Sequence, residues 1–113
     1  MSQLNVDSFN KQQKGKLSSK IALITGGDSS LGRAVAIAFA KEGADVAITY
    51  FNQQEQAEQT KEIVEQEGRS CLIITGDVRQ ETFCQKAVQE TINTFTKLDI
   101  LVNNAVQPQS SEN

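Results

Sequence analysis

Apolar residues along the chain fall into four short runs, separated by longer stretches in which they recur three and four positions apart. The short runs are rich in branched side chains and predict buried strands. They span residues 20–25 (KIALIT), 45–50 (DVAITY), 70–75 (SCLIIT) and 98–102 (LDILV). The longer stretches predict amphipathic helices at 31–42, 54–67 and 80–96. Single strands that alternate with helices predict an α/β fold with a parallel sheet and three right-handed crossovers.

The predicted helices have recognisable ends and apolar faces. Ser29 or Ser30 can cap the first helix, and Gly43 can supply a left-handed residue at its end. The expected core face of this helix is Leu31, Ala34, Val35, Ala38 and Phe39. The second helix has a narrow stripe of Ala57, Thr60 and Val64. The expected face of the third helix is Cys84, Ala87, Val88, Thr91, Ile92 and Phe95.

Composition separates a polar N-terminal segment from a globular domain. Residues 1–18 are rich in Gln, Asn, Ser and Lys, so we expect a flexible leader followed by one domain at 19–113. Hydrophobic residues make up 38% of the chain and charged residues 22%, which is typical of a globular protein. The net charge is −3 and the basic residues are scattered. Nucleic-acid binding needs a clustered basic face, so we expect none.

Membrane and metal sites are also not expected from the sequence. No apolar run approaches the roughly 20 residues that a membrane-spanning helix needs, and no signal peptide is evident. We therefore expect a cytoplasmic protein without a membrane partner. Cys71 and Cys84 match no metal or disulfide motif and are expected to be small buried hydrophobic residues. The chain has no His, the commonest metal ligand, so we predict no metal site.

The segment TGGDSSLGR at 25–33 lies between the first strand and the first helix. Glycines let the chain turn sharply and let phosphate oxygens approach the backbone, and a helix start offers unpaired N–H groups. Gly26 is expected to supply the turn and Gly32 the close packing of helix on strand, while Arg33 adds a cation. A purely structural turn is the alternative. The regular strand–helix units that follow favour a nucleotide site.

Three segments resemble, in their order and spacing, the motifs of the short-chain dehydrogenase/reductase family. They are TGGDSSLGR, GDV at 76–78 and LDILVNNA at 98–105. The resemblance runs from about Lys16 to Gln109 and is closest to the general-stress branch, which is similar to glucose/ribitol dehydrogenase-like proteins. It implies a truncated NAD(P)-binding Rossmann domain in which a three-layer half fold has strand order 3-2-1-4. The first two helices would then cover one face of the sheet and the third helix the other.

The resemblance also implies roles for individual residues. Gly26, Ser29, Leu31 and Gly32 would form the pyrophosphate turn, with Asp28 shaping it. Asp77 would bond the adenine amino group and Val78 would pack on the adenine ring, while Tyr50 would lie near the adenosine ribose. Asn104 and Ala105 would border the ribose nearer the nicotinamide, and Asn103 would tie neighbouring strands together. The alternatives are an ordinary turn residue for Asp77 and a strand-end turn for Asn103 and Asn104.

Two positions depart from the family pattern. Ser30 stands where the second glycine of TGxxxGxG belongs, so a hydroxyl either donates to a phosphate oxygen or crowds it. Val106 stands where the NNAG motif has glycine, and a β-branched residue is disfavoured if that site needs a positive φ. Both departures concern the expected cofactor site.

The catalytic set of the family is not found in these residues. The family uses a Tyr, a Lys four residues later and a Ser, but Gln54 lies four residues after Tyr50, the only tyrosine. The family's catalytic segment is expected beyond Asn113. We therefore assign no catalytic residue and predict that this chain alone is inactive.

The cofactor is expected to be NADP or NAD. A carboxylate at the end of the second strand would pair with the ribose of NAD, whereas a cation there would accept the extra phosphate of NADP. Residues 49–52 carry neither charge, and Asp45 begins the strand at the opposite edge of the sheet. The missing carboxylate favours NADP, with Arg33 as the nearby cation.

Three interpretations of function stay open. The first is the nucleotide-binding half of an NAD(P)-dependent oxidoreductase. The second is a non-enzymatic nucleotide-binding or interaction module that self-associates or pairs with a full-length relative, because a half fold would leave the fourth strand as an open, apolar edge. The third is an inert remnant.

Overall fold

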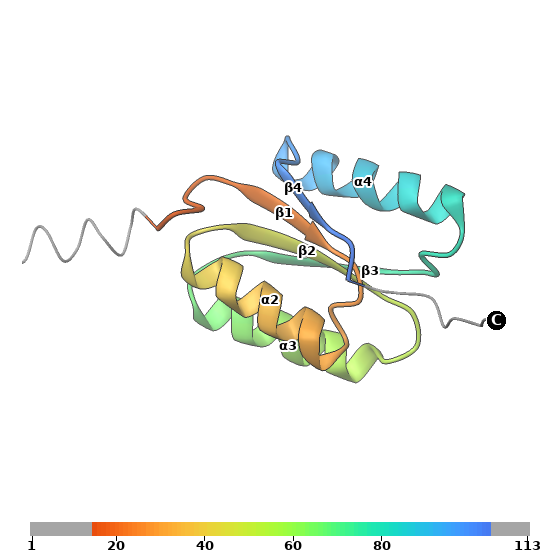
Figure 1. Ribbon diagram of the computed structural model, residues 1–113, viewed down its shortest axis with the longest axis horizontal. Coiled ribbons are helices and arrows are strands. Elements are labelled where there is room, and N and C mark those ends of the chain that lie inside the picture. The colour runs from red at the N-terminus through yellow and green to blue at the C-terminus, as the bar shows by residue number, and fades with distance from the viewer. Residues whose placement is uncertain (1–14, 105–113) are drawn as a thin grey trace, which may run out of the picture.

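The computed structural model describes residues 15–104 and shows an α/β fold (Figure 1). The strands are β1 (Ile21–Ile24), β2 (Asp45–Tyr50), β3 (Cys71–Thr75) and β4 (Ile100–Val102). The helices are α2 (Ser30–Lys41), α3 (Gln54–Gln66) and α4 (Glu81–Phe95). All neighbouring strands are parallel, and their order is β3-β2-β1-β4. The predicted fold class and strand order are confirmed.

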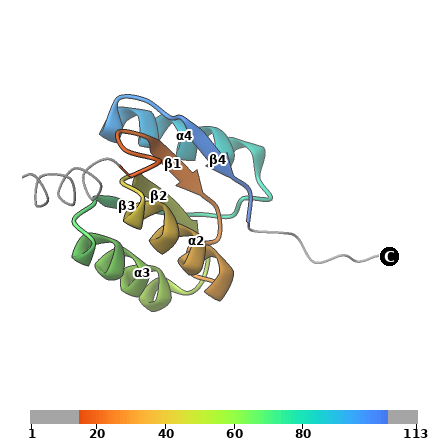
Figure 2. The ribbon, with the colours of Figure 1, turned by 60° about the vertical axis from the view of Figure 1, so that its left-hand side comes forward.

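Three layers are visible in the two ribbon views. Helices α2 and α3 lie together on one face of the sheet, and α4 lies alone on the other (Figure 1, Figure 2). The first two crossovers therefore lie on one face of the sheet and the third on the other, as the family resemblance implied. Because every strand runs in the same direction, the turns that follow the four strands meet at one edge of the sheet.

Two apolar clusters fill the space between these layers. The cluster under α2 and α3 is built from Ala22, Ile24, Ala36, Ala40, Val46, Ile48, Ala57, Val64 and Cys71. The cluster under α4 is smaller and contains Leu23, Ala47, Ile74, Phe83 and Ala87. Alternate residues of β1, β2 and β3 enter opposite clusters, and the sheet is buried on both faces at β1 and β2. Burial raises the pKa of the Cys71 thiol to about 12, which keeps it neutral.

The helix faces that the sequence predicted are confirmed for α3 and partly wrong for α2 and α4. The stripe of α3 is buried as predicted. In α2 the buried residues are Gly32, Ala36 and Ala40, while Leu31 is 65% exposed. In α4 they are Phe83, Ala87 and Thr91, and Cys84 is exposed. Small side chains mark the closest approach of α2 to the sheet. Of the predicted α2 face, Val35 and Phe39 pack against the cluster, whereas Ala34 and Ala38 are exposed.

The ends of the elements have local causes. Ser29 caps α2, because its Oγ accepts a hydrogen bond from the N–H of Gly32. Gly43 and Gly68 follow α2 and α3 with positive φ, which glycine adopts without strain. Strand β4 is shorter than predicted. The carboxylate of Asp99, in place of a backbone carbonyl, accepts the hydrogen bond from the N–H of Ile21.

Part of the predicted leader belongs to the described fold. Residues 16–19 form a turn, and the N–H of Leu17 donates to the carbonyl oxygen of Glu42 at the end of α2. The leader's other residues, 1–14, lie outside the described residues. Within 15–104 no helix is long and apolar enough to cross a bilayer. The same residues contain no cluster of potential metal ligands.

Candidate functional site

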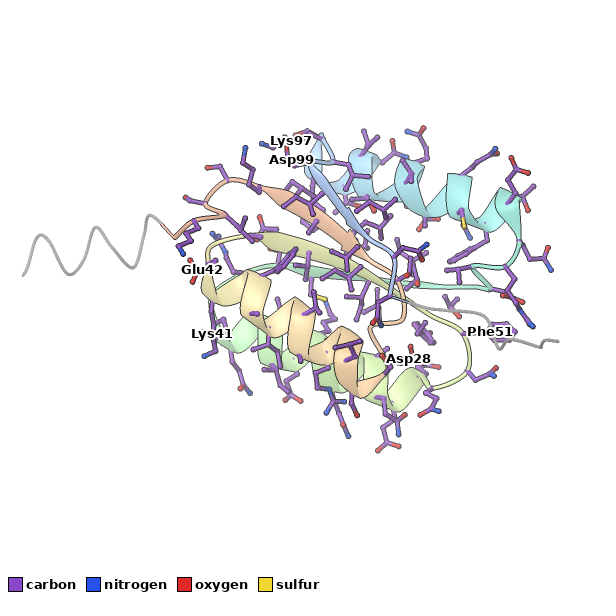
Figure 3. The ribbon with its side chains drawn as sticks, in the orientation of Figure 1. Asp28, Lys41, Glu42, Phe51, Lys97 and Asp99 are labelled. Atoms are coloured by element: carbon purple, nitrogen blue, oxygen red, sulfur yellow. The ribbon has the colours of Figure 1, made fainter. Side chains whose placement is uncertain are left out.

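An open cleft of about 430 Å³ lies at the edge of the sheet where the strands end. Its walls come from the glycine turn after β1, the start of α2 and the segments that follow β2, β3 and β4. The lining residues are Gly26, Asp28, Ser29, Leu31, Thr49, Tyr50, Phe51, Gly76, Asp77, Val78 and Asn104. Asp28 and Phe51 lie at this end of the molecule, and Lys41, Glu42, Lys97 and Asp99 lie at the other (Figure 3).

Thr49, at the end of β2, fixes the start of the glycine turn. Its Oγ1 accepts a hydrogen bond of 3.1 Å from the N–H of Gly26, and its carbonyl oxygen accepts one of 2.9 Å from Gly27. Gly26 has a φ of 73°, a conformation that side-chain-bearing residues rarely adopt. The chain therefore leaves β1 through a turn that is bonded to the neighbouring strand.

Two glycines of the turn allow backbone to approach closely. A Cβ at Gly32 would overlap the carbonyl oxygen of Gly26 and lie 2.9 Å from Nδ2 of Asn104. A Cβ at Gly27 would overlap the side chain of Ile48. Gly32 thus brings the first turn of α2 against the glycine turn itself, and Gly27 lets the turn pack on β2.

The start of α2 faces the cleft with backbone donors. Ser29 uses its Oγ for the N–H of Gly32 and its carbonyl oxygen for the N–H of Arg33. The N–H groups of Ser30 and Leu31 make no hydrogen bond within residues 15–104. The helix dipole adds a partial positive charge at the same point. This end of α2 can therefore hold an anion.

Asn104 ties the segment after β4 to the glycine turn. Its Nδ2 donates to the carbonyl oxygen of Gly26 at 3.3 Å and to Oγ of Ser29 at 3.1 Å. Its backbone N–H donates to Oγ1 of Thr25 at 2.8 Å, and Asn103 Oδ1 lies 3.3 Å from the same hydroxyl. The two asparagines therefore connect the edge strand to the turn rather than forming an isolated strand-end turn.

The opposite wall of the cleft follows β2 and β3. The N–H of Gly76 donates to the carbonyl oxygen of Tyr50 at 2.8 Å, which holds the ends of the two strands together. A Cβ at Gly76 would overlap the ring of Phe83 in α4. Apolar side chains of Tyr50, Phe51 and Val78 leave a surface here on which a flat ring can pack.

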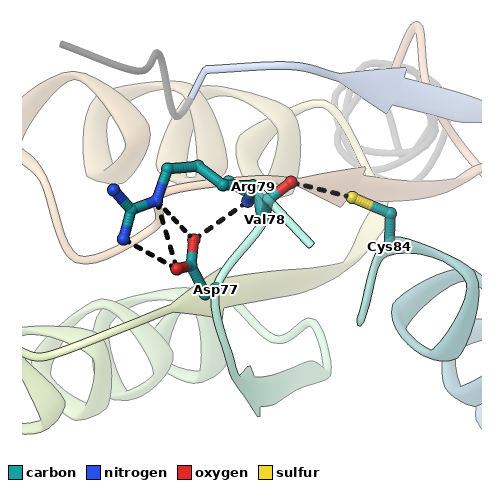
Figure 4. Close-up of polar contacts among 4 residues, drawn as sticks. All are labelled: Asp77, Val78, Arg79 and Cys84. Atoms are coloured by element: carbon teal, nitrogen blue, oxygen red, sulfur yellow. Dashed lines mark hydrogen bonds and ion pairs between the residues drawn. The ribbon is translucent and has the colours of Figure 1, made fainter. Parts of the chain in front are cut away.

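Asp77 is held by Arg79 in this wall. Both carboxylate oxygens of Asp77 accept hydrogen bonds from the guanidinium, at 2.8–3.1 Å, and Oδ1 also accepts the N–H of Arg79 (Figure 4). These hydrogen bonds lower the pKa of Asp77 below its usual value. Beyond Val78, the thiol of Cys84 donates to the Val78 carbonyl oxygen at 3.2 Å.

The cleft gathers most of the residues that the sequence predicted. Eight predicted residues line it: Gly26, Asp28, Ser29, Leu31, Tyr50, Asp77, Val78 and Asn104. Ser30 and Gly32 belong to the helix start without lining the cleft. Ala105 and Val106 lie outside the described residues.

Arg33 does not point into the cleft as expected. Its guanidinium donates to Oγ1 of Thr60 at 3.1 Å, to the carbonyl oxygen of Gln56 and to Oε1 of Gln59, all on α3. Gly32 faces the glycine turn, and the next position along the helix faces α3. The Arg33 side chain therefore points toward α3. The nearby cation is Arg79 instead, whose Cζ lies 6.0 Å from the centre of the Phe51 ring.

Four residues of this site had no individual role assigned from the sequence, namely Thr49, Phe51, Gly76 and Arg79. Three of them lie at or directly after the ends of β2 and β3, and Arg79 follows two residues after Asp77. In a parallel sheet these segments converge on one edge, so taking the residues around every strand end would have found them. Asp45, at the other end of β2, bonds Ser70 and Arg69 away from the cleft.

Comparison with known proteins gives consistent matches. The family model described as "short chain dehydrogenase" matches residues 20–113. General stress protein 39 of Bacillus subtilis is 58% identical over 97 residues, which cover 86% of this chain and 34% of that protein. NADPH-dependent aldehyde reductase 1 of Arabidopsis thaliana is 41% identical over 110 residues, which cover 92% of this chain and 38% of that protein.

A solved structure is similar as well. A short-chain dehydrogenase from Burkholderia cenocepacia in complex with NADP superimposes with a TM-score of 0.77 at 42% identity. The match covers 79% of this chain and 36% of that one. The chain therefore spans about a third of the length of the curated relatives it matches.

Proposed function

The chain belongs to the short-chain dehydrogenase family, and we propose that its cleft binds the nicotinamide dinucleotide of an oxidoreductase. The observation that carries this proposal is the convergence of the glycine turn, the α2 start and the ends of β2, β3 and β4 on one cleft. In doubly wound α/β folds a dinucleotide binds at the carboxyl edge of the sheet, with its pyrophosphate at a helix start. The similar proteins named for NADP or NADPH support NADP or NAD as the ligand.

Each wall of the cleft has a role in this proposal. The diphosphate lies against the N–H groups at the start of α2, and Gly26 and Gly32 keep the backbone accessible. Adenine packs on Val78, and its amino group donates a hydrogen bond to the Asp77 carboxylate. Tyr50 and Phe51 border the adenosine ribose. Asn104 borders the ribose nearer the nicotinamide.

We infer that the oxidoreductase chemistry belongs to the whole protein and not to these residues alone. Tyr50 has Gln54 four positions later, so the 113 residues contain no Tyr-x-x-x-Lys pair. Asn104 and Thr25 position the turn. The 113-residue chain should bind cofactor without turnover, and its location should be the cytoplasm.

A substitution at the α2 start tests the binding proposal. Ser30→Asp adds a negative charge in the first turn of α2, next to the backbone N–H groups that would hold the diphosphate, while an acidic residue at a helix start favours the helix. NADP and NAD should both bind wild type in calorimetric titration, and Ser30→Asp should weaken both by at least about tenfold through charge repulsion. Gln85→Glu, which adds the same charge on the exposed side of α4, should leave both affinities unchanged.

The titration has two outcomes that contradict the proposal. Wild type that binds neither dinucleotide contradicts it and supports an inert remnant. If Ser30→Asp binds both dinucleotides as tightly as wild type, the diphosphate does not lie at the start of α2. Turnover of an alcohol or sugar by the purified chain would contradict the inference that it is inactive alone.

We infer as a second function an interaction module that pairs through β4. Strand β4 has β1 as its one neighbour among residues 15–104, and Leu101 at the centre of β4 is 59% exposed. An unpaired edge with an exposed apolar side chain favours association with another chain. The partner in this case is a second copy or a full-length relative.

A further inference from the structure

Arg79 forms a charged contact at the mouth of the cleft. Its guanidinium bonds both oxygens of Asp77, with Nη2 to Oδ2 at 2.8 Å and Nε to Oδ1 at 3.0 Å. The same side chain lies over the ring of Phe51, with 6.0 Å between Cζ and the ring centre. Arg79 therefore spans the gap between the segment after β3 and the segment after β2.

Each oxygen of the Asp77 carboxylate has two contacts with Arg79 in this arrangement. Three hydrogens make these contacts: the backbone N–H bonds Oδ1, Nη2 bonds Oδ2, and the single Nε–H is shared between both oxygens. An adenine amino group that bonds Asp77 competes with this shared contact and loosens the guanidinium. Adenine binding therefore frees donors of Arg79 beside the end of β2.

The free donors lie where the adenosine ribose is expected. The ribose hydroxyls lie at the end of β2, and this segment, residues 50–53, carries no charge. The lining residues within 15–104 include no lysine or arginine, and Arg33 is bonded to α3. The two charged residues of the lining are Asp77 and Asp28, and Asp28, on the glycine-turn side, repels phosphate. The guanidinium of Arg79 is thus the group that can attract a phosphate at this position.

We propose that Arg79 recognises the 2′-phosphate of NADP after it has been partly released from Asp77 by the adenine amino group. This inference rests on the proposed dinucleotide site. A guanidinium forms two parallel hydrogen bonds to a phosphate, and the cation–π contact with Phe51 keeps Arg79 near the end of β2. NAD has a hydroxyl in place of this phosphate, so the Arg79 donors that its adenine frees have no phosphate to bind. Arg79 therefore determines the preference for NADP.

The test compares two adenosine ligands that differ in the 2′-phosphate. The full 113-residue chain is titrated with adenosine 2′,5′-bisphosphate and with 5′-AMP by calorimetry. Wild type should bind the bisphosphate at least about tenfold more tightly. Arg79→Gln should remove this preference and keep or raise the affinity for AMP, because Asp77 becomes free for adenine. Arg79→Lys should keep part of the preference, since the charge remains.

A matched control uses the other arginine that pairs with an aspartate. Arg69 pairs with Asp45 at the far edge of the sheet, and Arg69→Gln should leave both affinities unchanged. If Arg79→Gln keeps the preference, or weakens both ligands equally, the assignment of Arg79 is overturned while the dinucleotide site stands. If wild type binds neither ligand nor NADP, the dinucleotide site and this assignment both fail.

Discussion

Gly32 shows at the scale of single residues why the glycine turn is specific. A glycine inside a helix usually makes the folded protein less stable than an alanine at the same position would, by roughly 0.5–1 kcal/mol. Here a Cβ would overlap the Gly26 carbonyl oxygen, which is backbone and cannot rotate away. The sequence motif predicted close packing at Gly32. It could not show that the contact is the turn itself, because this depends on how Asn104 and Ser29 hold the turn.

Gly32→Ala should lower the free energy of unfolding by about 1–3 kcal/mol, as overpacking does elsewhere. Urea denaturation monitored by circular dichroism measures this change. Ala34→Gly, at an exposed position of the same helix, is the control and should cost roughly 0.5–1 kcal/mol. A Gly32→Ala variant more stable than wild type would mean that the close approach does not exist.

Strand and helix positions were predictable at the scale of elements because burial follows a local period. The bounds of β2 agree with the prediction, and those of the other elements differ by one or two residues at their ends. The buried faces of α2 and α4 were less predictable. Their rotation is set by the sheet, which selects Gly32, Ala36 and Ala40 for the closest contact in α2. The orientation of Arg33 toward α3 has the same cause.

Asp99 gives a pH-dependent test of how β4 is attached to β1. Its Oδ2 accepts the N–H of Ile21 at 2.8 Å, and this hydrogen bond, with the nearby Lys97, lowers the pKa of Asp99. A carboxyl whose pKa is lowered in the folded state stabilises that state at pH values above the ordinary pKa of about 4. This stabilisation is lost as the pH falls through the lowered pKa.

Asp99→Asn should therefore reduce the melting temperature at pH 7, and the difference from wild type should shrink as the pH falls from about 5 to below 3. Thermal melts at a series of pH values measure this difference. Glu62→Gln, which alters an exposed carboxylate on α3, should show little difference at any pH. A difference for Asp99→Asn that is constant with pH would mean that the charge does not hold the strand.

The sheet order was predictable at the scale of the whole molecule because right-handed crossovers and the family resemblance both restrict the topology. The position of the cleft followed from that topology, since parallel strands end at one edge. The Asp77–Arg79 contact did not follow, because it depends on a side-chain conformation. Edge strand β4 and the exposed Leu101 are the molecular features that predict association of this 113-residue chain.

Leu101→Lys should shift the chain toward the monomer, because a charge at an exposed strand edge opposes pairing. Sedimentation velocity over a range of concentrations measures the effect, and wild type should form dimers or larger species as its concentration rises. Leu31→Lys is the matched control, since Leu31 is 65% exposed but lies in the cleft. Wild type that stays monomeric at every concentration, or an equal effect of both variants, would exclude association through β4.

The central claim is that the start of α2 and the ends of β2 and β3 together bind one dinucleotide. Titrating the isotope-labelled chain with NADP and following the backbone amide signals by nuclear magnetic resonance tests it most directly. The account predicts large, saturable shifts for Ser30, Leu31 and residues 76–78, with little change at Ser70 and residues 97–99 on the far edge. Shifts confined to the far edge, or no shifts at millimolar NADP, would contradict it.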